Sequence, residues 1–94
     1  MSKKDEYAAK MKQQIDEMNQ NIDELEQKAR NASDSAEKKY DEQVEKLRGE
    51  VKQAREKLGE VESASENAWE SVKDEAEKVT NALKSSYNYF KSQL

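Results

Sequence analysis

The chain has 94 residues, of which 40% are charged and 33% hydrophobic, and its formal net charge is -4. It contains neither cysteine nor histidine, which excludes disulfide bonds and metal sites built on thiolate or imidazole ligands. Acidic and basic residues are mixed along the whole sequence without a basic block. We therefore expect no binding to nucleic acid.

Apolar residues recur at alternating steps of three and four along nearly the whole chain, and no proline interrupts them. This spacing places one narrow apolar stripe, called the seam below, along a helix. Because the stripe is narrow and the other faces are charged or amide, we expect it to pack against helices rather than to enclose a ligand. Its larger members are Met11, Ile15, Met18, Ile22, Leu25, Val44, Leu47, Val51, Leu58, Val72, Val79 and Leu83.

The stretch 31–37 is the first place where the helix could be interrupted. Asp34 and Glu37 have the spacing of a capping box, which is typical of a helix start. The heptad pattern nevertheless runs through this stretch with only a local drift, which a continuous helix accommodates. The pattern therefore favours continuity here.

The stretch 59–66 is the second possible break. Gly59 is a possible C-terminal glycine, and Ser63 and Glu66 again have capping-box spacing. Small polar residues follow, and we expect the helix to end within this stretch.

These patterns predict an all-α fold and a single module, residues 1–94, with one helix at about 4–60 and a second at about 63–92. Their lengths are roughly 80 and 42 Å, so a helix that folds back leaves the seam between residues 11 and 25 bare. We therefore expect self-association into a helical bundle, as an antiparallel dimer. Two alternatives stay open: one continuous rod of about 130 Å, and a monomeric three-helix bundle of about 45 Å.

Aromatic residues gather late in the sequence. Trp69 lies one position from the seam residue Ala68, Phe90 lies on the seam, and Tyr89 lies off it. Trp69, Tyr89 and Phe90 are therefore candidates for contact with a partner or a lipid surface, although Trp69 and Phe90 also suit a core. Tyr89 is the better candidate for an exposed contact.

The chemistry-bearing residues predict no enzyme. The carboxylates fall on exposed helix faces without a cleft that could shift their pKa values, and Gly49 and Gly59 stand alone rather than in a phosphate-binding loop. We expect no catalytic, cofactor-binding or metal-binding residues. The start lacks an apolar signal core and no run approaches the ~20 apolar residues of a membrane span, so we expect a cytoplasmic protein.

The sequence thus predicts a non-enzymatic, self-associating coiled-coil protein with a structural, adaptor or stress-associated role. The alternative is an apolipoprotein-like amphipathic binder of lipid surfaces, because the segment 69–94 is amphipathic and rich in aromatic residues. Association with a membrane surface is compatible with this second interpretation.

Several segments carry a family resemblance, above all Ser65-Glu66-Asn67-Ala68-Trp69-Glu70, and also the stretches 1–7, 11–16 and 22–25. Together they resemble small bacterial coiled-coil proteins that are sometimes grouped as a stress-response family and have no assigned biochemistry. The resemblance implies a bacterial, cytosolic and non-enzymatic protein. It supplies no catalytic or binding residue.

Overall fold

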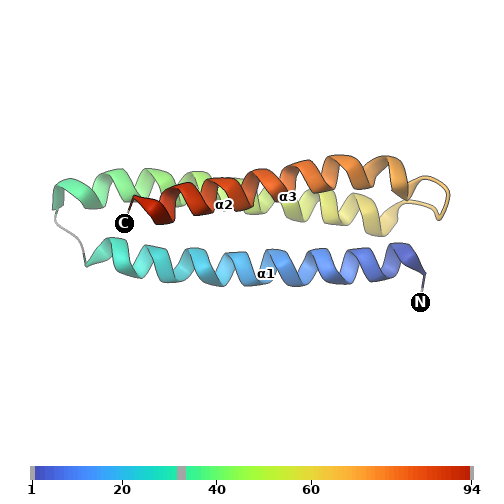
Figure 1. Ribbon diagram of the computed structural model, residues 1–94, viewed down its shortest axis with the longest axis horizontal. Helices are drawn as coiled ribbons and strands as arrows, with labels where there is room; N and C mark the ends of the chain where they lie inside the picture. The colour runs from blue at the N-terminus through green and yellow to red at the C-terminus, as the bar shows by residue number, and fades with distance from the viewer. Residues whose placement is uncertain (1, 32–33, 94) are drawn as a thin grey trace.

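The computed structural model describes residues 2–31 and 34–93, without the side chains of residues 34–38 (Figure 1). It contains the helices α1 (Lys3–Arg30), α2 (Asp34–Ser63) and α3 (Trp69–Ser92). The predicted all-α helical bundle is thereby confirmed. The predicted capping box of Asp34 and Glu37 falls on side chains outside the described part.

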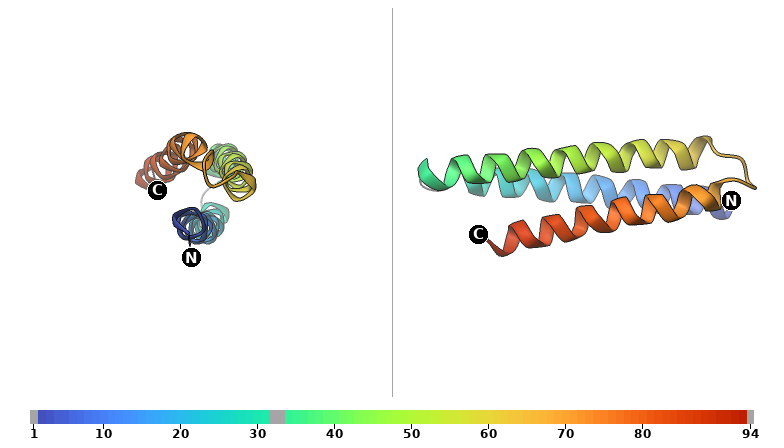
Figure 2. Two further views of the ribbon diagram at one scale, coloured as in Figure 1. Left: turned by 90° about the vertical axis from the view of Figure 1, so that its right-hand side faces the viewer. Right: turned by 90° about the horizontal axis from the view of Figure 1, so that it is seen from above.

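The helices lie side by side in an elongated bundle, and seen end-on they occupy the corners of a triangle (Figure 2). α1 and α3 run in the same direction, and α2 runs antiparallel to both. The principal extents are 51 × 19 × 18 Å. α2 packs closely against both neighbours, whereas α1 and α3 approach each other much more sparsely.

The predicted continuous helix over residues 4–60 is wrong. α1 ends at Arg30, where the backbone N–H of Asn31 donates to the Lys28 carbonyl at 3.2 Å, and α2 returns along α1. The physical reason is burial: by turning back, the chain covers the seam of α1 with its own second helix. Heptad spacing alone does not reveal this turn, because the pattern is the same on both sides of it. The described residues have the three-helix arrangement of the second alternative.

The second break falls in the stretch 59–66, and the next helix begins at Trp69 rather than at about residue 63. α2 continues in helical conformation through Gly59 and ends at Ser63. The Ser63 hydroxyl donates to the Gly59 carbonyl of its own helix at 2.9 Å instead of capping a new one. In the turn that follows, the Ser65 carbonyl accepts from the N–H of Trp69 at 3.0 Å.

The end of α2 is also held by the start of α1. The Lys4 ammonium donates to the carbonyls of Ala64 at 2.8 Å and of Glu62 at 3.2 Å. A cation at the C-terminal carbonyls satisfies acceptors that have no partner within the helix, and it interacts favourably with the helix dipole. The start of α1 is also capped, because the Ser2 hydroxyl accepts a hydrogen bond from the backbone N–H of Asp5.

The seam forms the core of the single chain. Met18, Val72 and Val79 are partly buried and pack against it. The other larger seam members are buried, and these are Met11, Ile15, Ile22, Leu25, Val44, Leu47, Val51, Leu58 and Leu83.

Trp69 rather than Ala68 begins the buried line of α3. Ala68 is exposed, whereas Trp69, Ala76, Leu83 and Phe90 follow one another at heptad spacing and are all buried. The assignment of Ala68 to the seam is therefore wrong. The indole buries far more apolar area than a methyl group, so the helix rotates to place Trp69 inward.

A charge introduced into the core should unfold the bundle. Ile22 is fully buried, so we expect Ile22→Lys to cost more than about 3 kcal/mol of unfolding free energy, measured by urea denaturation. Gln27 is exposed on the same helix, and Gln27→Lys should change stability by less than about 0.5 kcal/mol. Equal losses in the two variants would contradict the assigned core.

The two glycines of α2 should be replaceable with a gain in stability. Both have helical backbone angles, and a Cβ added at Gly49 or Gly59 meets nothing within 4 Å. We expect Gly49→Ala and Gly59→Ala each to stabilise the fold by about 1 kcal/mol, seen as a higher melting temperature in circular dichroism. A lower melting temperature in either variant would show that the glycine serves a purpose other than helix formation.

Candidate functional site

Ion pairs join α2 to both of its neighbours. Arg48 of α2 pairs with Asp23 at 2.7 Å and with Glu26, both on α1, and Arg55 pairs with Asp16 at 3.1 Å. The hydrogen bond from Arg48 lowers the pKa of Glu26, burial opposes this shift, and a further hydrogen bond from Arg30 adds to it.

The α2–α3 interface has its own polar contacts. Lys57 pairs with Glu75 at 2.9 Å, and the Ser86 hydroxyl donates to Glu50 Oε1 at 3.0 Å. The second carboxylate oxygen of Glu50 is buried without a protein partner. Complementary polar groups thus line both interfaces of α2.

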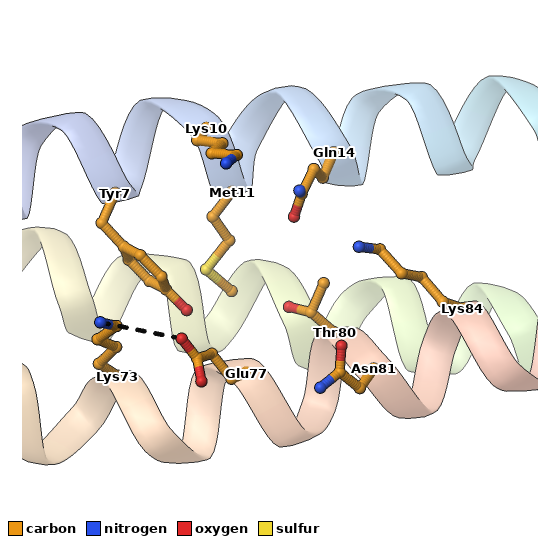
Figure 3. A pocket seen from close by; sticks show the side chains of 9 residues that line it. All are labelled: Tyr7, Lys10, Met11, Gln14, Lys73, Glu77, Thr80, Asn81 and Lys84. Atoms are coloured by element: carbon orange, nitrogen blue, oxygen red, sulfur yellow. Dashed lines mark ion pairs between the residues drawn. The ribbon is translucent and has the colours of Figure 1, made fainter.

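The α1–α3 interface is different, because no ion pair joins α1 to α3 in the part of the chain that the structure describes. An open cavity of about 350 Å³ lies there instead (Figure 3). We call it the α1–α3 groove, and it is lined by Tyr7, Lys10, Met11 and Gln14 of α1 and by Lys73, Glu77, Thr80, Asn81 and Lys84 of α3.

The residues at the floor of the groove are either apolar or have their hydrogen-bonding group already paired within the protein. Met11 is 2% exposed, and Thr80 is 7% exposed with its hydroxyl donating to the Ala76 carbonyl at 2.8 Å. The walls carry the charge. Figure 3 shows Lys84 reaching from α3 toward Gln14 of α1 across the opening. The groove therefore combines a neutral floor with cationic walls.

An aromatic cluster closes one end of the groove. The Tyr7 and Trp69 ring centroids lie 5.9 Å apart, and the Lys73 ammonium lies 5.6 Å from the Tyr7 centroid and 5.8 Å from that of Trp69. Burial raises the pKa of Tyr7, and the carboxylates of Glu77 and Asp74 raise it further. The phenol therefore stays neutral at physiological pH.

The predicted contact residues divide between core and surface. Trp69 is 6% exposed, and Phe90 is 1% exposed and packs edge-on against Tyr40 with centroids 5.6 Å apart. Both are core residues, as one of the two interpretations held. Tyr89 is 64% exposed, in keeping with its position off the seam. Trp69 and Phe90 can meet a partner or lipid only if α3 leaves the bundle.

Sequence reasoning did not find the α1–α3 groove. Tyr7 and Gln14 lie seven residues apart and directly precede seam positions, which marks them as flanking the seam. The sequence spacing therefore identifies these two residues as neighbours of the seam. The spacing does not tell which helix lies beside these residues, because the predicted long helix leaves no third helix next to α1.

Two features are absent from the residues that the structure describes, 2–31 and 34–93. No group of three or more acidic, cysteine or histidine residues there could hold a metal ion. No helix there is long and apolar enough to cross a membrane.

Comparison with protein-family models, curated proteins and solved structures finds no match for this chain. The resemblance to a bacterial stress-response family therefore stays a prediction from the sequence.

The Arg48–Glu26 pair should make the thermal stability of the fold depend on pH. Because the pKa of Glu26 is lowered in the folded state from its ordinary value of 4.5, its contribution is present above that value. The contribution is lost as the pH falls through the lowered value. We expect Glu26→Gln to reduce the drop in melting temperature between about pH 6 and pH 3 relative to the unmodified protein. Glu24→Gln, at an exposed position of the same helix, should leave the drop unchanged. An equal effect of the two substitutions would contradict the role of the pair.

Proposed function

We propose that the protein is a non-enzymatic helical-bundle adaptor of the cytoplasm, which folds as one chain and presents its surface to another protein. The observation that carries this proposal is the burial of the seam within the single chain. A bundle whose apolar stripe is already covered needs no second copy in order to fold. Its charged outer faces and the α1–α3 groove are the surfaces through which it can contact other molecules.

The prediction of self-association rests on a folded-back helix that leaves the seam between residues 11 and 25 bare. Met11, Ile15, Ile22 and Leu25 are 0 to 3% exposed, so that driving force is absent from this fold. Copies of the chain would have to associate through charged surfaces, which gives little stability per pair. We therefore favour a monomeric adaptor over the antiparallel dimer. A stress-associated role rests on the family resemblance alone.

The lipid-binding alternative requires a larger change. The apolar residues of α3 that would enter a lipid surface, including Trp69, Leu83 and Phe90, face the core. α3 would have to separate from α2 and break the Lys57–Glu75 pair. The adaptor role uses the folded bundle as it is, which is why the geometry favours it.

The adaptor proposal predicts that the folded chain contacts another protein inside cells. A photo-crosslinking amino acid placed at Asn81, which is exposed in the α1–α3 groove, or at Gln53, which is exposed on α2, should give an adduct of discrete mass from at least one position. The purified protein should sediment as a monomer from about 5 to about 500 µM.

Two results would overturn the proposal. Absence of an adduct from both positions would remove the adaptor role. A mass that rises with concentration to that of a dimer, together with adducts only between copies, would return the protein to the self-associating class.

A further inference from the structure

The α1–α3 groove carries a charge opposite to that of the whole chain. Lys10, Lys73 and Lys84 place three ammonium groups among its lining residues, against the single carboxylate of Glu77, so the lining has a formal charge of +2. The chain as a whole carries -4. Lys73 and Glu77 of α3 lie 4.0 Å apart, a loose pair that leaves Lys10 and Lys84 to face the opening. The ligand that complements this groove is an anion.

Charge alone does not describe the ligand, because part of the accessible lining is apolar. Met11 is 2% exposed and already packed in the core, so the apolar surface that the groove presents is the half-buried ring of Tyr7 and the aliphatic stems of its lysines. The Thr80 hydroxyl is already bonded to its own helix. A purely polar anion would leave the Tyr7 ring and the lysine stems without apolar contact. A ligand with an apolar face and a negative rim satisfies both parts of the site.

The shape favours an extended ligand. The lining residues of α3 run from Lys73 to Lys84, which corresponds to about 16 Å along a helix, and the groove is open between two helices that run in the same direction (Figures 2 and 3). α1 and α3 approach each other sparsely, so a further helix can lie across both. An amphipathic helix laid into a groove between helices is an established mode of recognition.

We propose that the α1–α3 groove binds an acidic amphipathic helix of a partner protein. Its apolar face lies on the Tyr7 ring and the aliphatic stems of the lysines, and its carboxylates pair with the ammonium groups of Lys10, Lys73 and Lys84. This inference rests on the proposed adaptor function and adds the chemistry of the partner. A second copy of this chain is a poorer occupant, because a two-fold dimer at the groove sets lysines against lysines.

The experiment uses the full chain and three synthetic peptides of about 21 residues, which is three heptads. The first has leucine at the first and fourth heptad positions with glutamate beside them. The second has lysine in place of glutamate, and the third has serine in place of leucine. We expect only the first to bind, with a dissociation constant of about 100 µM or lower at low salt, followed by amide chemical shifts and Trp69 fluorescence. The shifted amides should lie in the segments 7–14 and 73–84.

A matched pair of variants tests the lysines. Lys84→Glu should weaken binding of the first peptide about tenfold or more, because it replaces an attraction with a repulsion. Lys52→Glu makes the same charge change at an exposed position of α2 and should alter affinity less than about twofold. Lys84 is preferred to Lys73, whose ammonium also lies over two aromatic rings. Circular dichroism of each variant verifies the fold, and Lys84→Gln repeats the test without a new negative charge.

Each contrary outcome overturns the inference. Failure of the first peptide to bind, equal binding of the lysine peptide, or equal weakening by Lys52→Glu would remove the charge-selective groove. Equal binding of the serine peptide would leave a simple anion site in place of a helix site. If the cellular adduct forms at Gln53 while the peptides fail, the groove inference is wrong and the adaptor function stands. If no adduct forms at either position, the adaptor function itself is wrong.

Discussion

The structure depends on one constraint, which is that the narrow apolar stripe of each helix must be buried against other helices. The chain has few large apolar side chains, so little of this apolar area can be left exposed. A hairpin of α1 and α2 covers part of each stripe, and α3 covers what the hairpin leaves open. Ile15, Ile22, Leu47 and Leu83, from all three helices, are each no more than 1% exposed. Apolar burial of this kind is the dominant favourable contribution to folding, and it selects the turn between α1 and α2 over a continuous helix.

Two aromatic contacts set the position of α3 along the bundle. Trp69 near its start packs against Tyr7 of α1, and Phe90 near its end packs against Tyr40 of α2. Because these contacts lie at opposite ends of α3, sliding the helix by one turn would break both. Aromatic pairs add roughly 0.5–1.5 kcal/mol each beyond the area that they bury. They hold in place a helix whose contact with α1 is otherwise sparse.

Charge is distributed unequally over the three interfaces. α2 contributes Arg48 and Arg55 toward acidic residues of α1, and Lys57 toward Glu75 of α3. Most of these pairs are solvent-exposed and each contributes modestly, but together they favour the observed neighbours over other pairings. Apart from the carboxylate of Glu77 on α3, the charged groups that α1 and α3 present to each other are lysines. The same distribution that pairs the charges of α2 with its neighbours therefore leaves the α1–α3 groove with mainly cationic walls and no carboxylate from α1 in its lining.

The sequence by itself determined which face of each helix is apolar, and hence the all-α class, the buried residues around Ile22 and Leu47, and the exposure of Tyr89. Only the tertiary structure decided what covers each face. The turn after Arg30, the choice of Trp69 over Ala68, and the placement of Lys10 and Lys84 along one groove all depend on contacts between residues far apart in the chain. Periodicity reports local geometry, whereas a turn that leaves the heptad pattern unbroken is selected by long-range burial, which no local pattern records.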